Sequence, residues 1–265
     1  MKHTILFAFL SICTLEFAAQ TTTNTRVADM KPWRTTYFNM SFAVDNDHFN
    51  EMSLERMMAF SKNPEEIERD LRNMDAEITP ITAGVAIHTN VGIAPLNRST
   101  GEYHTDREVR IGIGLHAPKE AMVTYKSATL DTSIVYCNLH TEFTLEGAYI
   151  RKGTFGTHGR CYAGLGASGG VSFGNEMVLI TGRYFEPGAH PSEQVDKNPV
   201  MEKYAAKTLA YTRLFVPFGV HYGVADRWSV GLDFRLGIGA QFLAGASTNF
   251  IKKTGMFAIG FTKRI

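Results

Sequence analysis

Residues 227–242 read RWSVGLDFRLGIGAQF, and they alternate between apolar and polar or small side chains at every step. The even positions from Trp228 to Phe242 are apolar, whereas the odd positions carry Arg, Ser, Gly, Asp or Gln. A two-residue period predicts a β-strand with one apolar face. Strands usually have about 5 to 6 residues, so this one indicates a large apolar surface to lie against. A lipid bilayer is the first candidate.

The bulk composition is ordinary and excludes some classes of function. The chain has 265 residues, of which 44% are hydrophobic and 20% charged, and its net charge is +1. A dedicated nucleic-acid surface normally shows clustered basic residues and a high isoelectric point. We therefore expect no nucleic-acid partner.

The N-terminus has the pattern of an exported protein. Lys2 and His3 precede the apolar residues 5–12, and small residues follow at positions 18 and 19. This predicts a signal peptide over residues 1–20, with a buried helix as the alternative. A polar, flexible tail is expected over residues 21–33, and the folded domain over residues 34–265.

The two-residue period recurs along most of the remaining chain. It predicts strands near residues 36–44, 81–93, 109–115, 121–125, 135–149, 159–173, 177–185, 214–222, 227–242 and 257–265. No segment after the signal peptide has the roughly 18 unbroken apolar residues of a spanning helix. A membrane-spanning form must then be a closed barrel. We predict an all-β, antiparallel, up-and-down transmembrane β-barrel of about ten strands, with eight as the alternative.

One insertion interrupts the barrel pattern, at residues 45–80. Asn63 and Pro64 form a helix start signal, and Ile67, Leu71 and Met74 follow at helical spacing. We expect a short helical insertion near residues 50–75. A packed loop element is preferred there over a lid or plug.

The predicted links differ in length between the two ends of the barrel. Three tight links, at residues 128–131, 174–176 and 224–226, would lie on one side, and the two longest, at 45–80 and 186–206, on the other. Outer-membrane barrels have short periplasmic turns and longer outer loops. This interpretation places both ends of the barrel domain in the periplasm.

The polar face of the strands indicates which side is the interior. Alternation alone also fits a soluble barrel with an apolar lumen. Here the polar face combines glycines with isolated charges, which suits a narrow lumen filled by side chains such as Glu142, Glu146, Asp233 and Arg235. Five histidines share that face: His88, His116, His140, His158 and His221.

The signal peptide, the alternating strands, the tight turn at residues 225–228 and the last strand at 255–265 together resemble small Gram-negative outer-membrane β-barrel proteins of the porin-like superfamily. The resemblance implies location in the cell outer membrane and contact with outer-membrane lipid. It also implies that Phe257, Ile259 and Phe261 are read by the barrel-assembly machinery. The terminal Ile265 departs from the aromatic residue that is usual there.

Cys137 and Cys161 remain after removal of the signal peptide. Both are expected on the lipid face, near opposite ends of one hairpin. A disulfide needs Cα atoms within about 7 Å, so we predict two free thiols.

The sequence contains no motif that marks catalytic, cofactor-binding or metal-binding residues. GxGxxG occurs at residues 164–169, but strand alternation continues where a dinucleotide fold needs a helix. Asp45 and Asp47 have carboxylate spacing, although a cap or turn is the preferred interpretation. His116, His158 and Glu120 are expected near the outer rim without an adjacent serine, so a hydrogen-bonded network is preferred over a catalytic site.

A basic collar is expected at the same outer rim. It would comprise Arg151, Lys152, His158, Arg160, Arg183 and Lys207. Such residues could bind the phosphates of lipopolysaccharide.

The sequence therefore predicts a non-enzymatic outer-membrane barrel with a structural, surface-interaction or narrow-channel role. Two alternatives stay open. One is an outer-membrane-embedded lipid hydrolase or acyltransferase, and the other is a secreted soluble barrel that binds an apolar ligand.

Overall fold

The computed structural model describes residues 30–49, 58–65, 74–76, 81–127, 132–183, 200–244 and 249–265, and it confirms the all-β class. The predicted signal peptide, residues 1–20, lies outside the described residues. No helix within the described ranges is long and apolar enough to span a bilayer. The strands are β1 (Trp33–Phe49), β2 (Met74–Ala76), β3 (Ile81–Asn97), β4 (Glu102–Tyr103), β5 (Arg107–Ser127), β6 (Thr132–Phe155), β7 (Gly159–Arg183), β8 (Val200–Ala205), β9 (Leu209–Ala225), β10 (Trp228–Leu243) and β11 (Asn249–Arg264).

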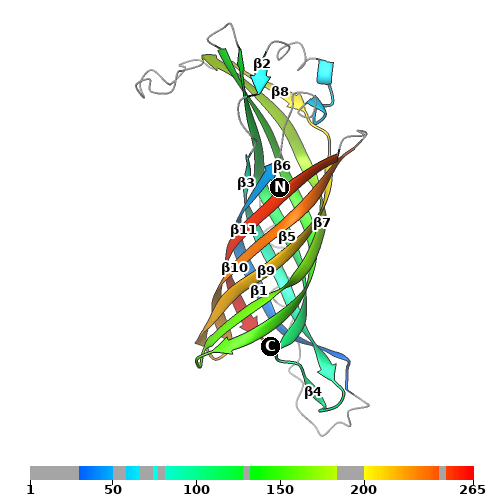
Figure 1. Cartoon of the computed structure of the whole chain (residues 1–265), viewed down its shortest axis with the longest axis vertical. Coiled ribbons are helices and arrows are strands. Elements are labelled where there is room, and N and C mark those ends of the chain that lie inside the picture. Colours follow the sequence, from blue (N-terminus) through cyan, green and yellow to red (C-terminus); the bar gives the residue numbers. More distant parts are fainter. Residues whose placement is uncertain are drawn as a thin grey trace, which may run out of the picture.

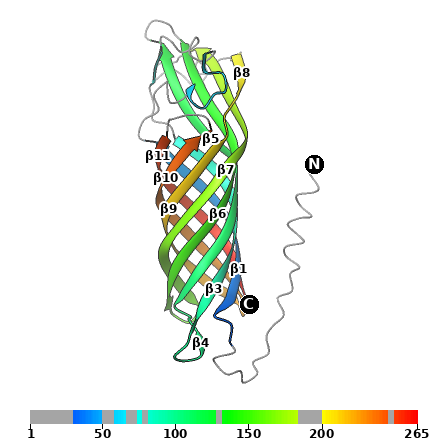
Figure 2. The same ribbon diagram turned by 90° about the vertical axis from the view of Figure 1, so that its right-hand side faces the viewer.

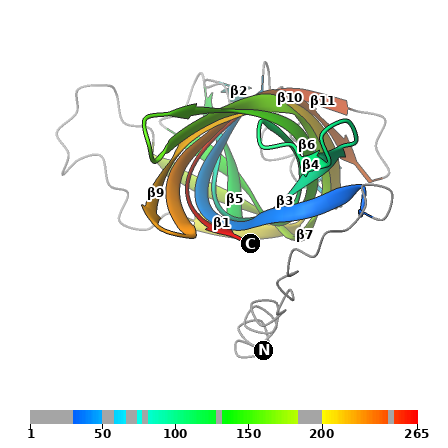
Figure 3. The ribbon, with the colours of Figure 1, turned by 90° about the horizontal axis from the view of Figure 1, so that it is seen from below.

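Eight of these strands close into a ring. The order is β1-β3-β5-β6-β7-β9-β10-β11, each neighbour is antiparallel, and β11 pairs with β1 to complete the circle. Figure 3 shows this ring from the end that carries the C-terminus. Closure leaves no unpaired strand edge in the wall, as a bilayer requires. The short strands β2, β4 and β8 lie outside the ring (Figure 1).

The ring has eight strands, the alternative number predicted from the sequence, because two predicted turns are wrong. β5 runs through residues 117–120 and β7 runs through residues 174–176. Both places are register shifts: one lies between His116 and Lys119, and the other faces Leu139 and Thr141. Gly174 takes a φ of 62° there. A β-bulge interrupts the alternation without ending the strand, so it resembles a turn in the sequence.

The apolar faces point outward, as predicted. Leu165 is 70% exposed and Leu236 60%, whereas His88 and Glu142 are at most 2% exposed. The interior is therefore polar and narrow. A soluble barrel would show the opposite pattern, so the apolar outer wall fits lipid.

The two ends of the barrel differ as expected, and the C-terminus lies at the end with the short connections (Figures 1 and 2). Residues 156–158 and 226–227 form two of these turns, and residues 98–106, which contain β4, form the third. The long connections, residues 50–80 and 184–208, join β1 to β3 and β7 to β9, and these strands have their joined ends at the opposite side of the ring. By turn length the C-terminal end is periplasmic. Because two predicted turns are absent, the β6–β7 hairpin is inverted: β5 ends and β6 begins at the extracellular end, and the turn at residues 156–158 lies at the periplasmic end.

Three strands continue beyond the ring at the extracellular end. β5, β6 and β7 have 21, 24 and 25 residues, whereas β10 and β11 have 16 each. Their extensions pair with β2 on one side and β8 on the other, giving the order β2-β5-β6-β7-β8; Figure 1 labels β2 and β8 at this end. We call this part the extracellular sheet. Met74, predicted in a helix, lies in β2; most of the expected helical insertion falls outside the described residues.

Candidate functional site

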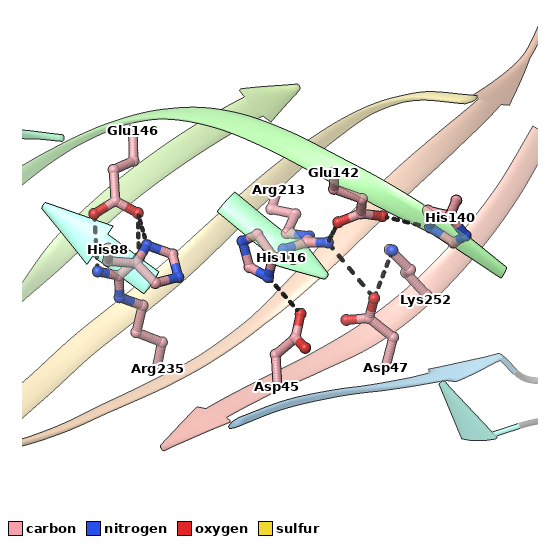
Figure 4. Close-up of polar contacts among 10 residues, drawn as sticks. All are labelled: Asp45, Asp47, His88, His116, His140, Glu142, Glu146, Arg213, Arg235 and Lys252. Carbon is pink, nitrogen blue, oxygen red and sulfur yellow. Dashed lines mark hydrogen bonds and ion pairs between the residues drawn. The ribbon is translucent and has the colours of Figure 1, made fainter. Parts of the chain in front are cut away.

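The extracellular half of the lumen is held by ion pairs between strands (Figure 4). Arg213 on β9 donates to Glu142 on β6 (2.8 Å) and lies 3.6 Å from Asp47 on β1. Lys252 on β11 donates to the same Asp47 (2.6 Å). His140 contacts Glu142 at 3.2 Å. These groups are buried, so the pairs offset the cost of removing their charges from water.

A second group spans the middle of the lumen. Glu146 on β6 accepts two hydrogen bonds from Arg235 on β10, and His88 Nδ1 lies 3.4 Å from the same carboxylate. The rings of His88 and His116 meet edge to face with centroids 4.9 Å apart, and His116 contacts Asp45 at 2.9 Å. Side chains from five of the ring strands thus meet across a narrow interior.

The periplasmic half contains a third group. Glu108 accepts hydrogen bonds from Tyr37 (2.6 Å) and Arg110 (3.0 Å), and it pairs with Lys152. The guanidinium of Arg110 stacks over the ring of Tyr162 at 3.9 Å. Burial of these groups continues the filled interior down to the periplasmic mouth.

The filled interior confirms the expected role of Glu142, Glu146, Asp233 and Arg235 as lumen side chains. Among the described residues, the two best-formed cavities measure about 30 and about 20 Å³. A water molecule needs at least about 10–15 Å³, so each cavity has room for only a few waters. These cavities do not amount to an open pore.

Asp45, His116 and Glu142 are the described residues with spacing suited to a metal ion. Their ligand atoms all lie within 4.8 Å of one another, and all three residues are buried. However, Arg213 already donates to Glu142 at 2.8 Å. A divalent cation there would face that guanidinium at close range in a low-dielectric site. The cluster is better suited to holding the barrel walls together than to binding metal.

Thr262, His221 and Asp233 have the connectivity of a catalytic triad. His221 contacts Asp233 at 2.9 Å through Nε2, and Thr262 Oγ1 lies 3.4 Å from His221 Nδ1. Tyr162 also donates to Asp233. All three triad-like residues are at most 9% exposed, and neither cavity is lined by Thr262 or His221. These two cavities therefore provide no substrate access to Thr262, which a nucleophile would need.

The predicted outer-rim residues do not gather in one place. Arg151, Lys152 and Arg160 lie on the β6–β7 hairpin at the periplasmic end, and His158 lies exposed in its turn. Arg183 ends β7 and Lys207 precedes β9, both at the extracellular end. The prediction of a basic collar is wrong, because the β6–β7 hairpin runs in the direction opposite to the predicted one. His116 is buried in the lumen, and Glu120 has its backbone in β5.

Several lumen residues were missed by the sequence interpretation. Asp45 and Asp47 lie in β1, which runs to Phe49, and not in a cap or turn. Lys252 fell in the predicted link at residues 243–253, and Arg213 lay just before the predicted strand that starts at Leu214. One signal was available: Asp45 and Asp47 continue the odd-numbered polar face that starts at Asn39.

The extracellular sheet combines a buried interior with an exposed edge strand. Met177, Val178 and Leu179 of β7 are at most 4% exposed, so both faces of β7 are covered here. This explains why that segment is apolar on both faces. On β8, Val200 and Met201 are 58% and 60% exposed.

The segment at residues 58–65 fastens the end of β8. Lys62 N–H donates to the Ala205 carbonyl (2.9 Å), and Lys207 N–H donates to the Phe60 carbonyl (2.7 Å). Phe60 is 2% exposed. Two connections from the extracellular end thus hold the edge strand in place.

The cysteine prediction agrees with the strand register. Cys161 is free and exposed, opposite Gly153, whereas Cys137 lies opposite Val178 on the same hairpin. In this register, Cys137 and Cys161 lie about fifty ångströms apart along the hairpin, at a rise of about 3.3 Å per residue. A bond between them would require a different register.

The closed ring, the apolar outer wall and the unequal ends decide the class. The chain is an outer-membrane β-barrel protein. No family model and no curated protein matches this barrel. It is similar to the solved structures of Neisserial surface protein A (12% identity, 86% of this chain and 97% of that chain, TM-score 0.33). It is also similar to the solved structure of Ail of Yersinia pestis in complex with the heparin analogue sucrose octasulfate (9% identity, 87% of this chain and 98% of that chain, TM-score 0.36). A third similar structure is the outer membrane protease OmpT from Escherichia coli (8% identity, 89% of this chain and 99% of that chain, TM-score 0.30).

Proposed function

We propose that this outer-membrane barrel is a non-enzymatic surface-interaction protein whose extracellular sheet contacts a protein partner. The observation that carries the proposal is the continuation of β5, β6 and β7 beyond the ring. The pairing of β7 with β9 ends at Val171, yet β7 continues to Arg183. A barrel needs no such extension to close its wall.

The edge strand β8 is the part of this sheet best suited to a protein partner. Its Val200 and Met201 side chains are apolar and more than half exposed. Edge strands present backbone groups that can pair with another chain, while alternate side chains give specificity. Lys203, which donates to Glu176 at 3.4 Å, places a charge beside the apolar pair.

The lumen supports the interaction role over the channel role. The Glu146–Arg235 and Asp47–Arg213 pairs join strands that lie three places apart in the ring of eight, so they cross the interior. An ion moving through would have to separate buried opposite charges, which is costly at low dielectric.

The hydrolase alternative has less support. The triad-like array at Thr262 is buried away from both cavities. Within the described ranges, the hydroxyls of Ser61 and Ser172 accept backbone N–H groups instead of contacting a histidine.

A photo-crosslinking experiment in intact cells tests the proposal. A benzophenone amino acid at Met201 should give a discrete protein adduct, and Val200→Glu should abolish it. The same probe at lipid-facing Val224, which is 61% exposed, is the matched control and should give none. The purified barrel should show no steady conductance in planar bilayers and no lipid turnover. Absence of the Met201 adduct together with conductance or lipid turnover would refute the proposal.

A further inference from the structure

We infer that Arg107 and Arg151 form a site for the phosphate headgroup of an anionic phospholipid in the periplasmic leaflet. The two residues are direct cross-strand neighbours on β5 and β6. Their side chains are 37% and 69% exposed. The next residues along the strands, Glu108 and Ile150, are fully buried in the lumen, so both arginines point outward toward lipid.

The pair is incompletely neutralised. Like charges directly opposite each other on a sheet repel. Asp106 is the acidic residue between them, with Oδ2 3.5 Å from Arg107 Nε and 3.6 Å from Arg151 Nη2. It also contacts His104 at 3.2 Å through Oδ1. Two guanidiniums thus share one carboxylate and leave a net positive charge.

The N–H donors of these two arginines also lack a full set of hydrogen-bond acceptors. Charge-assisted hydrogen bonds are usually about 2.7–2.9 Å long, and both contacts to Asp106 are longer. Arg107 Nε has no hydrogen-bond partner although it is shielded from solvent. A phosphodiester supplies the missing acceptors, and arginine binds phosphate through two parallel N–H groups.

Aromatic side chains place this pair at the level of the headgroups. Tyr149 and Phe155 lie on the same outward face of β6 as Arg151 and are 46% and 51% exposed. On other strands of this end, Trp33 and Trp228 are 51% and 47% exposed. Such residues mark the membrane–water interface of a barrel.

The outer wall on the bilayer side of Arg107 and Arg151 is apolar and suits acyl chains. This favours a lipid over a soluble anion as the ligand. Tyr149 lies opposite Leu165 on β7, and Leu165 is 70% exposed. A phosphate held by Arg107 and Arg151 would therefore continue into apolar wall on the bilayer side. Because this end is periplasmic, the ligand is a phospholipid of the inner leaflet, and the lipopolysaccharide leaflet lies at the far end.

Native mass spectrometry of the full barrel in detergent tests the site, with dioleoyl phosphatidylglycerol and dioleoyl phosphatidylethanolamine as probes. The unmodified barrel should bind phosphatidylglycerol about tenfold more tightly, since each basic residue near an anionic surface contributes several-fold. Arg107→Gln with Arg151→Gln should reduce the preference to about twofold or less. The matched control is Arg227→Gln with Lys263→Gln, which removes two charges from the same rim and should keep the preference.

Two more variants separate binding from a structural role. Asp106→Asn removes the competing carboxylate and should leave phosphatidylglycerol binding equal or stronger. If the double variant fails to show heat-modifiable mobility, the single Arg151→Gln change should still lower the preference at least about threefold. Retention of the preference without the two arginines, equal loss in both double variants, or weaker binding by Asp106→Asn would overturn the inference.

Discussion

Glu146 on β6 accepts two hydrogen bonds from the guanidinium of Arg235 on β10, three strands away around the ring. Glu146 is 8% exposed and Arg235 17% at their side chains. Loss of one partner leaves the other charge buried and unpaired. Glu146→Gln or Arg235→Met should therefore lower the free energy of unfolding by about 3–5 kcal/mol. Denaturant titration of the barrel in micelles would measure it.

The double variant with both changes is the control for this pair. Replacing both charges removes the unpaired group, so stability should return to within about 1–2 kcal/mol of the original. Additive losses from the two single changes would show that the residues do not act as a pair.

Gly170 faces the narrow lumen and Gly147 faces outward, so the two glycines differ in how much space surrounds them. A methyl group at Gly170 would lie 2.1 Å from the Phe143 carbonyl oxygen, whereas one at Gly147 has no neighbour closer than 3.9 Å. Gly170→Ala should destabilise the barrel by about 1–3 kcal/mol through overpacking against backbone. Gly147→Ala should change stability by less than about 0.5 kcal/mol. Equal effects in a denaturant titration would contradict the packing at Gly170.

The lipid-facing wall should tolerate charge according to depth. Leu236 lies in the middle of β10 and is 60% exposed, while Val224 lies near the periplasmic end of β9 and is 61% exposed. Leu236→Arg should cost about 2–4 kcal/mol in lipid vesicles, and Val224→Arg about 0–1 kcal/mol. Similar costs at both positions would show that Leu236 is not at the bilayer midplane.

The assigned orientation can be tested by labelling intact cells. In a background with Cys137 and Cys161 replaced by serine, Lys203→Cys on β8 should react with a membrane-impermeant maleimide. Thr157→Cys, in the turn of the β6–β7 hairpin, should react only after the outer membrane is permeabilised. The reverse pattern would invert the barrel and move the Arg107–Arg151 pair to the outer leaflet.

The strand faces were predictable because their cause is local. Alternation between Trp228 and Phe242 needs only the two-residue period of a strand, and the glycines and charges on the other face distinguish a lumen from a soluble surface. The outward position of Cys161 and the terminal strand followed from the same period. Residues 50–57 and 66–73, where the helical insertion was expected, lie outside the described part of the chain.

The strand number and the direction of one hairpin were decided only in three dimensions. Pro118 and Gly174 look like turn residues, but the neighbouring strands continue past both positions and supply partners, so the chain forms bulges instead. That difference moves Arg151 from the extracellular to the periplasmic end.

Sequence alone determined that this chain forms a two-faced β-wall, because side-chain alternation is a property of consecutive residues. Only the tertiary structure decided which residues meet in the lumen, since partners such as Glu146 and Arg235 are brought together by ring closure across 89 positions of sequence. It also decided which membrane face carries Arg107 and Arg151, because that depends on the number of times the chain crosses the bilayer.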